Sequence, residues 1–532
     1  MHFKLLFFFS FLFYSASGST KYWVSFSDKN GVAFDPLTYF ESRTIEQRIL
    51  QHIPLVDSTD FPLNQFYVQQ ITILADSVSW QSRWLNGIAI YASPLQVEKM
   101  KLFSFVSCIV PMTAKAVLAN KRGVYNNLSK IQKELLNYQT TRLKGNEFAK
   151  QKLDGTGIRI AVFDAGFPGV DKHPAFDHLR KNCRIIATYD FIKKREDVYH
   201  FSSHGTATLS CIAGLLDTVK IGMATGAEVL LARTEYAREI FSEEENWLAA
   251  AEWADRQGVN IISSSLGYLF ERYFNFEMNG KTSLVARAAT IAAQKGILVI
   301  SAAGNEGSDK WHFIDTPSDA DSVLTVGGTD PFTDFHIYFS SYGPTSDGRL
   351  KPNVSAPGQA IVATESGYAV ESGTSFSTPL VAGFAACAWQ KNRSWTNMQL
   401  FNAIEKSAHL YPYFDYAHGF GIPQADHILS NTIQTEPTFD FVIVNDEIKV
   451  VLREKYAYPE MESALGYKTQ RNFYYKLEDS SGTILYYKVL STDQKEMLHL
   501  TASQFNKGDV LTVHFEGYTS SFDLQDDDSD IK

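Results

Sequence analysis

The spacing of apolar positions changes twice along the chain and divides it into three stretches. In the first stretch, short apolar runs lie at residues 22–26, 87–91 and 106–110, and helix-period segments lie at 44–52 and 94–103. Strands interleaved with two helices over about 90 residues are typical of a small ferredoxin-like α+β sandwich. We therefore predict that residues 19–122 hold a domain of this kind and a linker.

From residue 157 onward, apolar runs alternate with helix-period segments. The predicted strands are 158–163, 228–232, 259–264 and 297–301, and the predicted helices are 206–215, 244–256 and 282–295. This alternation indicates an α/β domain with a doubly wound, mostly parallel sheet that helices cover on both faces. We place this domain at residues 123–430. The polar stretch 113–145, which overlaps the start of this domain, predicts an accessible connection.

Helical periodicity ends near residue 429, and short alternating runs follow. They lie at 441–444, 448–452, 472–477, 484–489 and 510–515, and turn-forming residues separate them. Short strands at this spacing predict an all-β sandwich over residues 431–532. The acidic end at 526–530 is expected to be solvated.

The first eighteen residues have the pattern of a cleavable signal peptide. Lys4 precedes an apolar run at residues 5–14, and small residues follow at 15–18. The alternatives are a buried N-terminal strand or an uncleaved anchor, although the run is too short to span a bilayer comfortably. We expect a product that is secreted or held in the periplasm or cell envelope, without a membrane span in its mature form.

Composition narrows the function classes. The 532 residues are 45% hydrophobic and 20% charged, which is typical of a globular protein. A net charge of -10 argues against nucleic acid and anionic membranes as partners. The cysteines Cys108, Cys183, Cys211 and Cys387 are too few for a disulfide scaffold, and Cys211 and Cys387 lie in apolar helical patterns that favour free thiols over a bridge. No Cys/His cluster has zinc-ligand spacing, so we predict no metal site.

Three separated residues carry the candidate chemistry. Asp164 ends the predicted strand 158–163, where a buried carboxylate can orient an imidazole, and His204 comes at the start of a predicted helix. Ser375 follows Gly373-Thr374 at the start of an apolar helix, whose free N–H groups and positive dipole end suit an oxyanion. A serine hydroxyl needs such a base and such a carboxylate to become a nucleophile. Each residue alone also fits a helix cap or a surface turn.

A fourth residue completes the set, and the order of the four is informative. Asn305 lies just after the predicted strand 297–301 and offers a second oxyanion donor, with an ordinary turn asparagine as the alternative. The chain order Asp, His, Ser is the subtilisin order among three known solutions to triad geometry. The sequence around Ser375 excludes the Gly-x-Ser-x-Gly elbow of the α/β-hydrolases.

Seven ordered motifs then give a specific resemblance. The chain resembles subtilisin-like serine proteases, or subtilases, over residues 123–430. The motifs are Asp-Ala-Gly at 164–166, His-Gly-Thr at 204–206, Ser-Ser-Leu-Gly at 264–267, Ala-Ala-Gly-Asn-Glu-Gly at 302–307, Ser-Ser-Tyr-Gly-Pro at 340–344, Lys-Pro-Asn-Val-Ser-Ala-Pro-Gly at 351–358, and Gly-Thr-Ser-Phe-Ser-Thr-Pro at 373–379.

The resemblance implies a role for each of these positions. Asp164, His204 and Ser375 become the catalytic triad, and Asn305 with the Ser375 backbone N–H becomes the oxyanion hole. Six residues become walls of a cleft that pairs with the peptide backbone: Ser265, Leu266, Gly267, Ala302, Ala303 and Gly304.

The resemblance also implies how the protein matures and what it acts on. Residues 19–122 become a propeptide that assists folding and inhibits the enzyme in cis, and polypeptides become the substrates. No cofactor is required. A structural calcium ion is left open, since no Asp-rich loop has recognisable ligand spacing.

Two other readings stay open from the sequence. One is a secreted binding protein with a retired protease fold, a class whose members usually lose a triad residue. It also fits a narrow processing peptidase whose cleft is shaped by Glu243, Glu244 and Glu245, although we expect these three residues on a solvated helix face.

Overall fold

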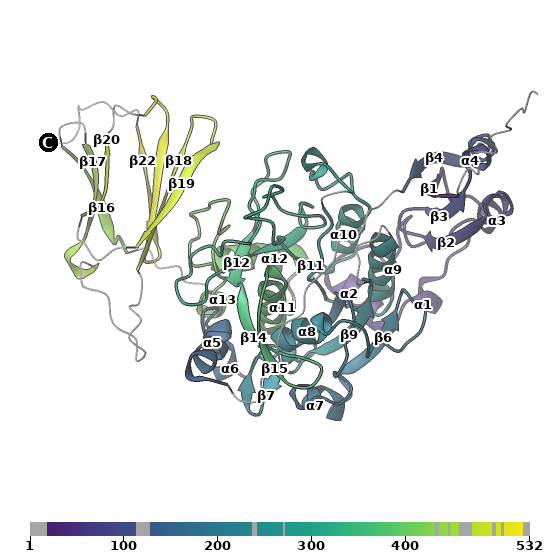
Figure 1. The fold of residues 1–532 in the computed structure, drawn as a ribbon, viewed down its shortest axis with the longest axis horizontal. Helices are drawn as coiled ribbons and strands as arrows, with labels where there is room; N and C mark the ends of the chain where they lie inside the picture. Colours follow the sequence, from purple (N-terminus) through teal and green to yellow (C-terminus); the bar gives the residue numbers. More distant parts are fainter. Residues whose placement is uncertain are drawn as a thin grey trace, which may run out of the picture. The chain divides into compact units, whose positions relative to one another are not determined.

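A computed structural model describes residues 19–112, 128–236, 242–269, 272–430, 436–444, 447–456, 471–491, 496–501 and 505–524. The predicted signal peptide at 1–18, the first part of the connection at 113–127 and the acidic end at 526–530 lie outside these residues. The chain divides into two compact units. Unit 1 comprises residues 1–35 and 56–114, and unit 2 comprises residues 36–55 and 115–532 (Figure 1).

Unit 1 is a four-stranded antiparallel sheet with two helices. The sheet order is β2-β3-β1-β4, and Val24, Ile71, Ile88 and Met100 belong to its apolar core. This arrangement confirms the predicted α+β sandwich, although its first helix and its second strand were not predicted. The elements are β1 (Thr20–Phe26), α3 (Gln65–Leu74), β2 (Ser77–Ser82), β3 (Gly87–Ala92), α4 (Pro94–Met100) and β4 (Val106–Pro111).

The predicted helix at 44–52 exists but does not belong to that sandwich. Helices α1 (Pro36–Tyr39) and α2 (Ser42–Leu50) lie in the short segment that unit 2 contains. The assignment of this helix to the α+β sandwich is therefore wrong. A local pattern of apolar residues predicts that a helix forms but cannot tell which unit it packs against.

The centre of unit 2 is a seven-stranded parallel sheet in the order β13-β12-β11-β10-β5-β9-β6. All six residues of β5 are buried, which explains its unbroken apolar run because both faces of such a sheet are covered. The doubly wound α/β prediction is confirmed, and three outer strands were missed. The strands are β5 (Arg159–Asp164), β6 (Ile185–Asp190), β9 (Glu228–Arg233), β10 (Ile261–Ser264), β11 (Leu298–Ala302), β12 (Val323–Thr329) and β13 (Val354–Pro357).

Helices pack on this sheet in pairs, α8 with α11 and α9 with α10. Every residue of helix α11 from Thr374 to Trp389 is buried, as expected for a helix in the middle of a domain. The helices of this part are α5 (Lys130–Thr141), α6 (Gly145–Lys150), α7 (Asp177–Lys181), α8 (His204–Ala213), α9 (Ser242–Arg256), α10 (Leu284–Gln294), α11 (Thr374–Lys391), α12 (Asn397–Ser407) and α13 (Ala425–Ser430).

Part of the predicted connection at 113–145 is ordered. Helix α5 begins after Ser129, which forms a capping box with Gln132, and it buries Leu135 and Leu136. A polar surface and two buried leucines are enough for a surface helix, so the expectation of an open connection is wrong over these residues. The short strands of this part are β7 (Leu215–Leu216), β8 (Val219–Lys220), β14 (Gln359–Ala363) and β15 (Tyr368–Ser372).

The last hundred residues form two antiparallel sheets, which confirms the predicted all-β sandwich. One sheet has the order β16-β17-β20 and the other β19-β18-β21-β22. Phe439 and Ile448 of the first sheet share one apolar core with Phe473 and Leu511 of the second. The strands are β16 (Phe439–Val444), β17 (Glu447–Leu452), β18 (Asn472–Glu478), β19 (Ile484–Ser491), β20 (Glu496–Thr501), β21 (Val510–Phe515) and β22 (Tyr518–Asp523).

Two further observations concern the state of the cysteines and the length and apolar character of the helices. All four thiols are free; Cys211 and Cys387 are buried, whereas Cys108 and Cys183 are exposed. None of the described helices combines the length and the apolar character that crossing a bilayer requires.

Candidate active site

Asp164 is the last residue of β5, a central strand of the parallel sheet, and it is fully buried. Its Oδ1 accepts hydrogen bonds from the Ala165 N–H at 2.7 Å and is 2.8 Å from His204 Nδ1. Its Oδ2 accepts from the Thr208 hydroxyl at 3.0 Å. Both oxygens are therefore held, and the carboxylate can fix the orientation of the His204 ring.

His204 is the first residue of α8, and its side chain is 31% exposed. The following glycine makes this position feasible: a Cβ on Gly205 would lie 2.3 Å from the Gly166 carbonyl oxygen and 2.9 Å from Asp164 Cβ. The first turn of α8 thus approaches the end of β5 closely. Burial lowers the pKa of His204, but the charge and hydrogen bond of Asp164 outweigh it, so the pKa is raised above its ordinary value.

Ser375 is the second residue of α11, after Gly373, whose φ of 153° favours glycine. The Ser375 hydroxyl lies 3.4 Å from the Ser265 carbonyl oxygen, and the Ser265 hydroxyl donates to the Ser375 carbonyl oxygen at 2.8 Å. The ring of the next residue, Phe376, lies 5.8 Å from the His204 ring, centroid to centroid. The start of α11 and the His204 ring are therefore neighbours.

The four candidates are not joined into one hydrogen-bonded chain. Among the described residues, Asp164 bonds to His204, whereas no hydrogen bond joins His204 to Ser375. Catalytic hydrogen bonds are often long or poorly aligned until substrate binds, so this geometry is compatible with a resting enzyme.

Asn305 connects the end of β11 to the start of α11. Its Oδ1 accepts from the Thr374 N–H at 2.9 Å and from the Thr374 hydroxyl at 3.1 Å. Because the carbonyl end of the amide is occupied, the NH₂ end is left as a donor, and the residue is exposed. The amide is therefore oriented by the residue that directly precedes Ser375.

The six predicted wall residues lie at the carboxyl ends of two adjacent parallel strands. Ser265, Leu266 and Gly267 follow β10, whereas Ala302 ends β11 and Ala303 and Gly304 follow it. These loops emerge at the carboxyl edge of the sheet, the edge at which Asp164 also lies, and such edges are where parallel sheets bind ligands.

Two acidic residues that the sequence analysis did not single out lie against these walls. A Cβ on Gly267 would be 2.4 Å from Asp315 Oδ2, and a Cβ on Gly304 would be 2.5 Å from the same oxygen and 2.6 Å from Glu306 Oε2. Burial raises the pKa of Glu306, although hydrogen bonds from the Asn305 backbone and with Asp315 act against it. Glu306 belongs to the motif at 302–307, but no motif predicts Asp315, which reaches the walls from a loop.

The three glutamates at the start of α9 are buried, so the expectation of a solvated face is wrong. Glu243 Oε2 lies 3.1 Å from Arg272 Nη2, and the Tyr273 hydroxyl donates to Glu244 at 2.8 Å. Burial raises the pKa of Glu244 despite the nearby Arg272. Their partners come from a loop about 30 residues further on, and the periodicity of a helix contains no information about it.

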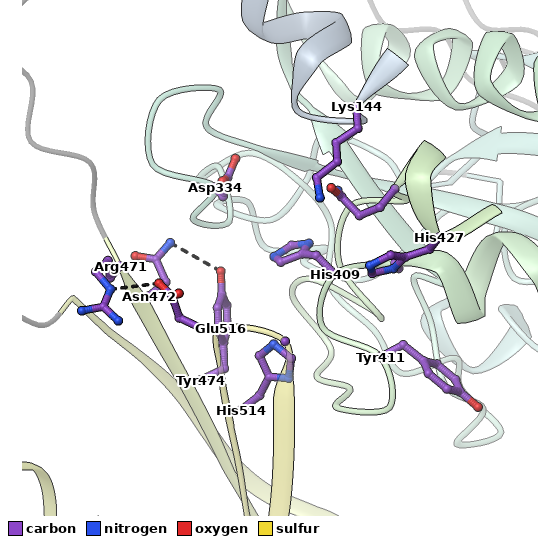
Figure 2. A pocket seen from close by; sticks show the side chains of 13 residues that line it. Lys144, Asp334, His409, Tyr411, His427, Arg471, Asn472, Tyr474, His514 and Glu516 are labelled. Carbon is purple, nitrogen blue, oxygen red and sulfur yellow. Dashed lines mark hydrogen bonds and ion pairs between the residues drawn. The ribbon is translucent and has the colours of Figure 1, made fainter. Parts of the chain in front are cut away.

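A pocket of unit 2 that contains none of the predicted site residues is drawn in Figure 2. Three histidines contribute to its lining, His409, His427 and His514. Burial and the charge of a neighbouring histidine lower the pKa of His409 and of His514 to about 3. These two imidazoles are therefore neutral in the folded protein near neutral pH.

The described residues contain no candidate metal site. No group of three or more His, Cys, Asp or Glu side chains within them is arranged to hold an ion. The carboxylates named above are bound to protein groups instead.

Comparison with known proteins gives two family matches. The Subtilase family matches residues 155–422, and the Peptidase S8 propeptide domain of Bacteroidota matches residues 21–127. The second match agrees with the predicted propeptide.

Individual relatives align with the central part of the chain. Subtilisin BL of Lederbergia lenta is 29% identical over 264 residues, which are 48% of this chain and 85% of that protein. M-protease of Shouchella clausii is 29% identical over 259 residues, and alkaline elastase YaB of Bacillus sp. is 30% identical over 262. Each of these two alignments covers 48% of this chain and 60% of the relative.

The family match spans half of the chain and includes the parallel sheet and all four candidate residues. The fold and the order of the motifs agree with it. The chain therefore belongs to the subtilase family of serine peptidases and carries a propeptide domain ahead of its peptidase domain.

Proposed function

We propose that this chain is the precursor of a secreted serine endopeptidase that cleaves polypeptides through Asp164, His204 and Ser375. The observation that carries the proposal is the 2.8 Å contact between His204 and the buried carboxylate that ends β5, with Asn305 anchored beside Ser375 at the start of α11. Together they bring a base, its orienting group, a nucleophile and an oxyanion donor to one edge of the sheet.

In the proposed reaction, His204 acts first as base and then as acid. Because Nδ1 binds Asp164, the ring carries its proton there, and Nε2 takes the proton of Ser375 as the hydroxyl attacks the peptide carbonyl. The same proton then passes to the leaving amine as the carbon–nitrogen bond breaks. Water repeats the sequence on the acyl-enzyme, and the acid product leaves with Ser375 restored.

The oxyanion hole has two donors in this proposal. The Ser375 N–H belongs to the first turn of α11, where backbone donors lack partners within the helix and the dipole is positive. The Asn305 amide supplies the other donor. The substrate backbone pairs with Ser265–Gly267 and Ala302–Gly304 at strands β10 and β11, and no cofactor takes part.

The precursor is inactive until its propeptide is removed, and a signal peptide at residues 1–18 directs export in this proposal. The match of residues 21–127 to a propeptide domain supports the first step. The short apolar run at residues 5–14 supports the second.

The test compares Ser375→Ala with a matched serine on the same stretch, Ser372→Ala. We expect Ser375→Ala to abolish peptide hydrolysis, self-processing and labelling by a fluorophosphonate, and Ser372→Ala to keep all three. Hydrolysis that survives in Ser375→Ala refutes the nucleophile. A wild-type chain that folds but neither labels nor cleaves supports the retired-protease reading instead.

A further inference from the structure

A twenty-residue piece of the propeptide region is built into the peptidase part of the chain. Residues 36–55 lie inside the propeptide match, yet they belong to unit 2, while the sequence on both sides belongs to unit 1. We refer to residues 36–55 as the inserted segment. It contains α1 and α2.

The inserted segment buries a charge against α9. Arg48 is 1% exposed, and its Nη2 lies 2.9 Å and 3.1 Å from the two carboxylate oxygens of Asp255, which is also buried. The Phe40 ring covers the guanidinium at 4.2 Å. Two charges that are this deeply buried stabilise a structure only when they are together, because either one alone is left without solvent or a partner.

Polar side chains of α2 also satisfy the end of α9. The Thr44 hydroxyl donates to the carbonyl oxygens of Asp255 at 3.0 Å and Arg256 at 3.2 Å, and Gln47 Nε2 donates to that of Gly258 at 3.0 Å. The last carbonyls of a helix have no partners within it, so these contacts replace solvent. The buried residues of α2 are Thr44 and Arg48, so the helix packs through polar groups.

A second contact joins two other helices. Gln51 is buried, its Nε2 donates to the Gly296 carbonyl oxygen at 3.0 Å beyond α10, and its Oε1 accepts from the Asn397 N–H at 2.9 Å at the start of α12. A Cβ on Gly296 would lie 2.6 Å from the Ile53 side chain, so the packing there is close. The inserted segment thus caps α9, α10 and α12 at once.

The remaining contacts show which edge of the sheet it occupies. Arg43 Nη2 donates to the Gly157 carbonyl oxygen at 2.7 Å, and Arg159 Nη1 lies 3.1 Å from Glu41 Oε2. Arg159 begins β5, and Asp164 ends it. The inserted segment therefore lies at the amino edge of the parallel sheet, opposite the edge that carries the candidate triad.

We propose that the inserted segment stays bound to the peptidase part after the rest of the propeptide is cut away, so that the mature enzyme is a non-covalent complex of two chains. Its departure would remove the cation that pairs with Asp255 and the side-chain hydrogen bonds that it makes at three helix ends. Its retention leaves the triad edge open. The flanking residues Asp35 and Leu55 are exposed, so hydrolysis on both sides, with one water consumed per bond, releases unit 1 and keeps the segment.

The proposal rests on the proposed maturation, and the experiment separates the two. Full-length wild-type enzyme is matured, purified by size exclusion under native conditions, denatured and weighed by mass spectrometry. We expect a peptide that contains residues 36–55 in a one-to-one ratio with the mature chain. A mature chain without this peptide, at full activity and with an unchanged melting temperature, overturns the proposal.

A Ser375→Ala chain that carries inserted recognition sites for an added site-specific protease beside residues 35 and 55 gives the same readout without self-processing. Retention there, with no maturation of the wild type, refutes only the proposed function. Loss of the peptide from both samples refutes only the retention.

Variants of α2 make the result specific. Arg48→Met keeps the apolar stem without the charge, and we expect the peptide to be lost during size exclusion and the melting temperature of the mature chain to fall. The control Ile49→Ala changes a side chain that is 59% exposed on the same helix and should behave as wild type.

If Arg48→Met does not fold, a synthetic peptide of residues 36–55 is added to mature chain from which the native peptide was washed in mild urea. A rise in melting temperature with this peptide, but not with its Arg48→Met form, supports the proposal. An equal response to both peptides contradicts it.

Discussion

Thr374 should act on catalysis only through Asn305. Two bonds from Thr374, at 2.9 Å from its N–H and 3.1 Å from its hydroxyl, hold the Asn305 carbonyl oxygen and so aim the amide NH₂. Replacement by valine keeps the shape and the backbone bond but removes the hydroxyl bond. We therefore expect Thr374→Val to reorient a donor without deleting it.

The magnitudes of the two substitutions follow from these contacts. Removing one oxyanion donor costs a subtilisin about 10²–10³ in kcat, or about 2.7–4 kcal/mol, which sets the expectation for Asn305→Ala. One neutral hydrogen bond is worth about 1 kcal/mol, so Thr374→Val should lower kcat about fivefold. KM should change little in both variants, since the donor acts on the charge that develops in the transition state.

A double-mutant cycle tests the coupling. We measure kcat and KM on a chromogenic peptide for the wild type, both single variants and the double variant, with melting temperatures to verify folding. If Thr374 works through Asn305, the double variant should be no slower than Asn305→Ala. A further fivefold loss in the double variant would refute this reasoning, because Thr374 would then act by another route, such as its bond to the Gly304 carbonyl oxygen.

Three other predictions concern charge. The raised pKa of His204 means that kcat/KM should rise with pH through a midpoint above 6.5, and Asp164→Asn should lower both this midpoint and, by about 10⁴, kcat; an unchanged midpoint would contradict the pairing. The unfolded chain protonates His409 and His514 below about pH 6.5, but the folded protein does so only near pH 3, so stability should fall as pH drops across that window, by up to about 1.4 kcal/mol per pH unit for each histidine. The free energy of unfolding, measured by urea denaturation at several pH values, should depend less steeply on pH in His514→Gln than in the wild type, and an equal dependence would count against this account. Asp315→Asn removes a carboxylate between the two glycines of the predicted cleft walls, so in a peptide library cleavage after Lys or Arg should decrease more than cleavage after Leu, whereas equal losses would exclude a charge effect.

The candidate catalytic residues could be predicted from the sequence because each of them lies where a local pattern begins or ends. Asp164 follows an unbroken apolar run, His204 opens α8 and Ser375 opens α11. Strand and helix ends are visible in periodicity, and parallel strands bring such ends to one edge. The fold class followed from the same alternation of apolar runs.

Contacts between residues that are distant in sequence could not be predicted. The glutamates at the start of α9 were expected in solvent because nothing within that helix indicates Arg272 and Tyr273. Asp315 likewise reaches the cleft walls from a loop without a motif. Periodicity reports on one element at a time, whereas the burial of a charge depends on a partner that only tertiary structure supplies.

Helix α2 shows a different limit of prediction from the sequence. Its apolar residues suggested a packing face, yet Ile49 and Leu50 are exposed, and the helix is buried through Thr44 and Arg48. An amphipathic pattern identifies the face that packs only when the contact is apolar. Here the contact consists of helix ends and a carboxylate, so polar residues form the buried face, and a pattern-based reading assigns the helix to the wrong unit.

The two edges of the parallel sheet therefore have different consequences for the precursor. Inhibition in cis requires contacts at the carboxyl edge, where Asp164 and the predicted cleft walls lie, and such contacts must be broken for activity. The contacts of Arg48, Thr44 and Gln51 lie at the amino edge, so they do not compete with substrate binding at the opposite edge. In the proposed maturation, removal of the inhibitory part and retention of the supporting part are thus physically independent, so we expect peptide hydrolysis on both sides of the inserted segment to activate the enzyme without destabilising its sheet.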